Sequence, residues 1–205
     1  MIAVTYPRLA KPAVSAEPTP MIFPRFGRKS RDPDTISALY GMIVAQARLP
    51  CFYRDYAVAD TVNGRFDLIV LHLALLVDRL ALGEGLRGLG QGLFDRFCQD
   101  MEHNLREMGV GDLKVPEEMR RMGEAFYGRA QAYRAALSAA DAGQALVEAV
   151  SRNIYGGSPA SPAAAGRLAT YIRATVRDLK GQDPASLAAG NLRFPDPAAI
   201  PAAPR

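Results

Sequence analysis

The chain has 205 residues, of which 49% are hydrophobic, and this length suits one folded domain with tails. Its net charge of +4 is carried by interspersed residues of both signs; it permits attraction to RNA or anionic lipid, but no dense basic run or zinc-ligand spacing is present. Alanine and leucine dominate the apolar residues, which favours helices over strands. Cys51 and Cys98 lie far apart and outside any C-x-x-C motif, so we expect two reduced thiols in a cytoplasmic protein.

Residues 1–31 are rich in proline, alanine and basic residues and lack a helical period, so we expect a disordered basic N-terminal tail. Within it, residues 21–30 (MIFPRFGRKS) alternate aromatic and basic side chains, which fits either a membrane-surface anchor or an ordinary tail. Translation starts at either Met1 or Met21. The arginine-rich, acid-poor composition is also typical of a mitochondrial transit peptide, whereas the Ala/Arg/Gly usage elsewhere favours a bacterial gene.

The first predicted helix begins between Asp32 and Asp34, because aspartate is a good N-cap and proline fits the first turn. Leu49-Pro50 ends it, and an aromatic segment at residues 52–56 and a turn at residues 60–64 follow. Residues 66–82 are apolar nearly all round, which predicts the central helix of a bundle. The charged and polar residues inside this stretch favour a buried helix over a membrane span.

Residues 83–92 are predicted to form a glycine-rich loop that closes the central helix. Further helices are predicted at residues 93–108, 116–139, 142–155 and 161–180, with a final turn at residues 183–189. Gly109 is well placed as the C′ residue of the helix before it. The expected fold is therefore an all-α, single-domain bundle of about six helices over residues 32–190, followed by a disordered Pro/Ala-rich tail at residues 191–205.

Signals for catalysis or cofactor binding are weak. Residues 83–88 match G-x-G-x-x-G, but a helix rather than a strand precedes them, so we interpret them as an interhelical loop. His72 and His103 are the only histidines and lack a metal-ligand pairing. His72 fits a hydrogen-bonded core histidine, with haem ligation as the alternative. We predict no catalytic residue, cofactor or metal, and a protein that is not an enzyme.

Several blocks of the sequence resemble the ubiquinol–cytochrome c chaperone family. They are residues 39–48 (LYGMIVAQAR), 60–72 (DTVNGRFDLIVLH), 100–113 (DMEHNLREMGVGDL) and 124–129 (EAFYGR). Their order and spacing also fit, and the resemblance covers residues 35–139. It implies a non-enzymatic assembly factor of the cytochrome bc1 complex, which serves the respiratory chain by binding newly synthesised cytochrome b.

The resemblance also implies partners and a location. Mitochondrial members of the family work with a small helical partner protein and associate with the ribosome. We expect a location peripheral to the bacterial inner membrane, with contact through the basic tail, or alternatively the matrix side of the mitochondrial inner membrane. No DNA partner is expected. The alternative functions are a translation-coupled ribosome or RNA binder and a haem-handling protein that uses His72.

Positions that match the family blocks are the candidates for contact with a client or partner. Some of them, such as Gly109 as a helix cap, are expected to be structural instead. The candidates are Tyr40, Gln46, Arg48, Arg65, Asp67, Asp100, Asn104, Glu107, Gly109, Asp112, Tyr127 and Tyr133.

Overall fold

The computed structural model describes residues 33–157 and 162–201, and within them every regular element is a helix. Six of the helices described have 12 or more residues, which confirms the predicted all-α bundle. The predicted N-terminal tail, the cap at Ser161 and residues 202–205 lie outside the described residues. The elements are α1 (Pro33–Ala47), α2 (Pro50–Arg54), α3 (Val62–Ala81), α4 (Arg87–Glu107), α5 (Val115–Ser138), α6 (Ala142–Asn153), α7 (Pro162–Gly181), α8 (Pro184–Ala188) and the 3-10 helix η1 (Pro197–Ala199).

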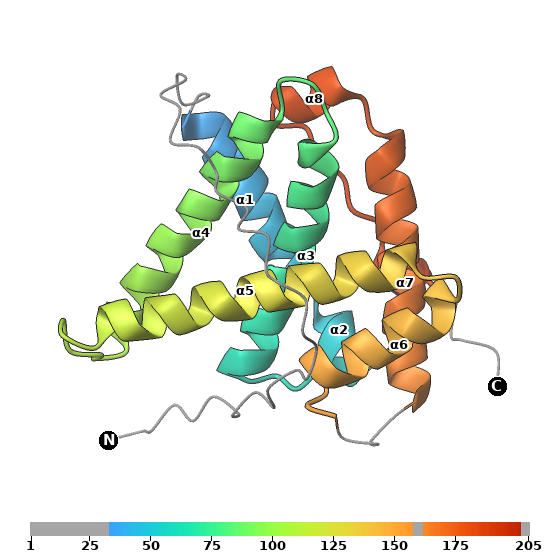
Figure 1. Cartoon of the computed structure of the whole chain (residues 1–205), viewed down its shortest axis with the longest axis horizontal. Coiled ribbons are helices and arrows are strands. Elements are labelled where there is room, and N and C mark those ends of the chain that lie inside the picture. Colours follow the sequence, from blue (N-terminus) through green and yellow to red (C-terminus); the bar gives the residue numbers. More distant parts are fainter. Residues whose placement is uncertain (1–32, 158–161, 202–205) are drawn as a thin grey trace.

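Helix α3 is the centre of the bundle, as its apolar composition predicts. It buries 13 of its 20 residues and packs against α1, α4, α5 and α7. Figure 1 shows the long α5 running across α3. The helix begins earlier than predicted, because the hydroxyl of Thr61 accepts a hydrogen bond from the Gly64 N–H at 3.1 Å. The predicted turn at residues 60–64 is therefore the cap and first turn of α3.

The glycine-rich segment after α3 is mostly helix, which corrects the predicted loop at residues 83–92. Helix α4 begins at Arg87, so the loop is short. A Cβ atom on Gly92 would lie 2.4 Å from Cδ1 of Ile36, so this glycine lets α4 pack closely on α1. Glycine disfavours a helix when only its local propensity counts, but at this position the missing side chain allows the two helices to pack closely.

The corner between α4 and α5 is shaped by Gly109, whose φ of +79° lies in the left-handed region. Its N–H donates to the Arg106 carbonyl, and the Val110 N–H donates to the Leu105 carbonyl, each at 3.0 Å. These are the two bonds of a Schellman motif, and they confirm the predicted C′ position. The motif satisfies the last carbonyls of α4 and turns the chain toward α5.

Residues 191–201, which we call the C-terminal strap, pack on the bundle and correct the expectation of a disordered tail from residue 191. Leu192 is buried, and the ring of Phe194 lies 5.1 Å from that of His72. The Tyr56 hydroxyl donates to the Pro197 carbonyl at 2.7 Å. A proline lacks an N–H that needs a partner, so a proline-rich segment can pack on the bundle with few unpaired backbone donors.

No helix among the described residues is both long and apolar enough to cross a membrane.

Candidate functional site

Two of the twelve candidate residues lie in the interior between α3 and α5. Asp67 pairs with Arg129 at 2.6 Å, and the Arg129 guanidinium lies 5.7 Å from the centre of the Phe66 ring. Burial raises the pKa of Asp67 to about 7, although the neighbouring Arg129 counteracts this effect. Tyr133 is fully buried on α5. In this conformation the Asp67–Arg129 pair holds α5 against α3, and Tyr133 is part of the core.

Gln46 belongs to a buried hydrogen-bond chain that ties α1, α3 and α7 to the strap. Its Nε2 donates to the hydroxyl of Tyr171 and to the Pro195 carbonyl, each at 3.0 Å. The Tyr171 hydroxyl in turn lies 2.8 Å from Nε2 of His72, whose Nδ1 lies 2.7 Å from the Leu68 carbonyl. A carbonyl only accepts, so Nδ1 carries the proton and Nε2 accepts from Tyr171.

This chain leaves His72 without a free ring nitrogen. The side chain is completely buried, and burial lowers its pKa to about 4, so the imidazole is neutral near pH 7. The arrangement is that of a hydrogen-bonded core histidine, as the sequence suggested. In this conformation neither nitrogen is available to a haem iron.

Tyr40, Asp100 and Asn104 come together where α1 meets α4. The Tyr40 hydroxyl donates to Oδ2 of Asp100 at 2.9 Å, and Nδ2 of Asn104 donates to the Asp100 carbonyl at 2.7 Å. Burial and the Asp100 carboxylate together raise the pKa of Tyr40. Tyr40 is buried, whereas Asp100 and Asn104 lie half-buried at the surface. The tyrosine therefore anchors the two surface side chains.

The α4–α5 corner carries Glu107, Gly109 and Asp112. Arg106 pairs with Asp112 and, at 2.9 Å, with Glu102, while Glu107 lies 3.1 Å from His103.

Two apolar side chains at this corner escaped the sequence analysis. Leu113 is 98% exposed and Met108 is 44% exposed. Their only sequence signal is an apolar residue in a loop of glycine and aspartate. The corner therefore presents two exposed apolar side chains beside the Arg106 ion pairs.

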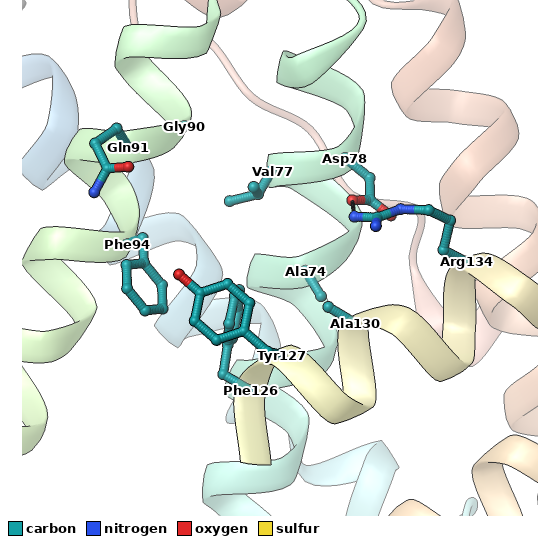
Figure 2. A pocket seen from close by; sticks show the side chains of 10 residues that line it. All are labelled: Ala74, Val77, Asp78, Gly90, Gln91, Phe94, Phe126, Tyr127, Ala130 and Arg134. Atoms are coloured by element: carbon teal, nitrogen blue, oxygen red, sulfur yellow. Dashed lines mark hydrogen bonds and ion pairs between the residues drawn. The ribbon is translucent and has the colours of Figure 1, made fainter. Parts of the chain in front are cut away.

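Tyr127 lies at the edge of a small cleft between α3, α4 and α5, drawn in Figure 2. Its ring packs 5.4 Å from that of Phe94, which lies 4.9 Å from Phe126. The cleft has a volume of about 30 Å³. It is lined by Ala74, Val77, Asp78, Gly90, Gln91, Phe94, Phe126, Tyr127, Ala130 and Arg134.

Polar groups stand at the two ends of this cleft. At one end Arg134 pairs with Asp78 (Figure 2). At the other, Nε2 of Gln91 donates to Asp95 at 2.7 Å, while its Oε1 is buried and accepts no hydrogen bond within the described residues. The cleft therefore has an apolar floor between two polar ends, which is suited to an apolar side chain.

Arg48 and Arg65 lie on a different part of the surface, around a hollow of about 530 Å³. The hollow is bounded by the end of α1, by α2 and by the start of α3. Both arginines are exposed, and Arg65 pairs with Asp60 at 2.8 Å. The twelve candidates therefore divide among several surfaces and the interior rather than forming one site.

Metal and thiol chemistry find little support in the described residues. No group of three or more His, Cys, Asp or Glu side chains there is placed to hold a metal ion. Burial raises the pKa of Cys98 to about 11 and also raises that of Cys51, so both are thiols rather than thiolates near pH 7.

Comparison with known proteins places these surfaces in context. The family described as "Ubiquinol-cytochrome C chaperone" matches residues 54–194. The chain is also similar to the protein in the crystal structure of the Cbp3 homolog from Brucella abortus. The two sequences are 37% identical, the TM-score is 0.74, and the alignment covers 82% of this chain and 92% of that chain. No protein with a curated description matches. Because the family match spans well over half of the sequence and a crystal structure agrees with it, the chain belongs to the ubiquinol–cytochrome c chaperone family.

Proposed function

We propose that this protein is a non-enzymatic assembly factor that binds newly synthesised cytochrome b and promotes assembly of the cytochrome bc1 complex. The observation that carries the proposal is the family match over residues 54–194. The 37% identity to a structure described as a Cbp3 homolog supports it. The work would take place at the inner membrane, where the client is inserted.

The aromatic cleft at Tyr127 is the surface best suited to an apolar client. Tyr127 is 41% exposed and, with Phe94, presents ring faces above the buried Phe126 (Figure 2). Exposed aromatic side chains bury large apolar areas at little entropic cost. The exposed rings beside this small cleft would contact side chains on the apolar face of an unassembled membrane helix.

Two of the other surface candidates would add polar contacts beside the cleft. Asp100 and Asn104 lie on α4, the helix that also supplies Phe94 to the cleft, whereas Glu107 and Asp112 lie at the α4–α5 corner, outside this contact. Polar rims orient a partner and contribute less affinity than the apolar centre. A small helical partner and the ribosome stay predictions from the family resemblance.

The proposal is tested by capture of the tagged full chain from respiring cells in mild detergent, with cytochrome b probed in the eluate. Wild-type protein should enrich cytochrome b over other membrane proteins, and Tyr127→Ala should weaken capture about 30-fold, as expected for an aromatic hot spot. Leu113→Ala is the matched control, because it removes an exposed apolar side chain at the α4–α5 corner instead of the cleft.

A deletion strain supplies the second readout. Loss of assembled bc1 complex on deletion, restored by the wild-type chain and not by Tyr127→Ala, would support the client and the cleft together. If Leu113→Ala weakens the capture of cytochrome b and Tyr127→Ala does not, the client site lies at the α4–α5 corner. Normal bc1 levels in the deletion strain would contradict the function itself.

A further inference from the structure

An open basic hollow lies where the end of α1 meets α2 and the start of α3. Its volume is about 530 Å³, and its lining consists of Arg48, Pro50, Tyr53, Arg54, Asp60 and Arg65. The hydroxyl of Tyr53 donates to the Ala47 carbonyl at 2.8 Å, which holds the ring against the last residue of α1. Three guanidinium groups thus border one space: those of Arg48, just after α1, Arg54 on α2 and Arg65 on α3.

The charges around the hollow leave one arginine uncompensated. Arg54 pairs with Asp55 at 2.7 Å, and Arg65 pairs with Asp60 at 2.8 Å. Arg48 is exposed and forms no ion pair with the residues that the structure describes. Three positive charges against two negative ones leave a local charge of +1, which a single monoanion balances. Guanidinium groups bind planar carboxylates and phosphates through paired hydrogen bonds, and a phosphodiester is such a monoanion.

One apolar residue lines the same hollow, and another lies one helical turn from it. Val62 is 58% exposed and lies three residues before Arg65, so the two side chains share a face of α3. Pro50 is exposed in the lining itself. A phospholipid presents a phosphodiester directly above an apolar layer, whereas inorganic phosphate has no apolar part and a nucleic-acid backbone presents its phosphates beside sugars. The combination of basic and apolar groups therefore favours the lipid.

We propose that this hollow binds the phosphate of an anionic phospholipid headgroup and that Val62 and Pro50 face the bilayer surface beside it. The site differs from the cleft at Tyr127 and is independent of the client. It would hold the folded domain on the membrane through its own surface, in addition to any contact made by the basic N-terminal tail.

Vesicle sedimentation tests the proposal with the full chain. Vesicles of phosphatidylcholine doped with phosphatidylglycerol should bind the protein, and vesicles of phosphatidylcholine alone should not. Arg48→Gln/Arg65→Gln should weaken binding about 30-fold, because each arginine near an anionic surface strengthens partitioning about fivefold. The matched control is Arg173→Gln/Arg177→Gln, which removes the same charge from the exposed face of α7 and should change binding less than threefold.

Three results would overturn the proposal. Equal losses in both double variants would mean that the vesicles respond to net charge and not to this hollow. Displacement of the protein from the vesicles by inorganic phosphate, at the phosphate concentration of the lipid, would assign the hollow to a free phosphate. Loss of RNA binding in Arg48→Gln/Arg65→Gln with vesicle binding intact would assign it to a nucleic-acid backbone. Because no arm contains cytochrome b, the outcome is independent of the proposed function.

Discussion

Two buried ionisable groups on α3 should make opposite contributions to the pH dependence of stability. Burial lowers the pKa of His72 from 6.5 to about 4, so the stability that comes from its neutral form is present above pH 6.5 and is lost as the pH falls toward 4. Burial raises the pKa of Asp67 from 3.8 to about 7. The stability that comes from the protonated carboxyl is therefore present below pH 3.8 and is lost as the pH rises through 7.

The two contributions are similar in size. One pKa unit corresponds to about 1.4 kcal/mol, so acidification from pH 7 to pH 4 costs about 3 kcal/mol through His72 and returns about 3 kcal/mol through Asp67. The wild-type free energy of unfolding should therefore be nearly flat over this range. Asp67→Asn removes one of the two contributions and keeps a neutral side chain that still accepts a hydrogen bond from Arg129. The variant should lose about 3 kcal/mol between pH 7 and pH 4.

Urea titrations at several pH values, followed by far-UV circular dichroism, provide the assay for a helical chain that contains no tryptophan. Glu84→Gln, which neutralises an exposed carboxylate in the α3–α4 loop, is the control and should keep the wild-type profile. The reasoning is refuted if Asp67→Asn and wild type show parallel profiles. It is equally refuted if the variant gains stability on acidification.

The same titrations check three further expectations. Tyr171→Phe should lower the free energy of unfolding by about 1–3 kcal/mol, because Nε2 of His72 then lacks its donor in a buried site; a change under about 0.5 kcal/mol would contradict the hydrogen-bond chain. Gly109→Ala should cost about 1 kcal/mol because of its positive φ, whereas Gly111→Ala, at a glycine without one, should be nearly neutral. A chain that ends at Gly190 should lose about 3 kcal/mol with the buried side chains of the strap, and unchanged stability would show that the strap does not hold the bundle.

The fold was largely predictable because amphipathic spacing and capping residues act locally. Helix α3 is recognisable from its apolar run alone, and Gly109 from its place after the last periodic residue of α4. The start of α4 was predicted too late, because its glycines were interpreted as part of a loop. The role of Gly92 in helix packing depends on Ile36, a residue far away in the sequence. Composition alone does not show which glycines separate helices and which allow them to pack closely.

The strap and the surfaces were less predictable for a related reason. The proline-rich sequence of the strap is typical of disorder, yet its carbonyls accept hydrogen bonds from Gln46 on α1 and from Tyr56, two residues after the end of α2. The family resemblance supplied Tyr127, but the cleft beside it requires side chains from three helices and emerged only from the structure. The exposed Leu113 has no periodic signal, since a loop residue belongs to no helical face.

The strap also determines when one part of the core can close during synthesis of the chain. Gln46, on the first described helix, bonds to the Pro195 carbonyl, 149 residues later in the chain. A ribosome delivers the N-terminal part first, so the helices can begin to pack while the residues that cover His72 and Tyr171 are still untranslated. Closure of this part of the core must therefore wait until the strap itself has been synthesised and has left the ribosome. A fusion partner attached directly after residue 201 would crowd this last step, and an affinity tag is better placed at the N-terminus.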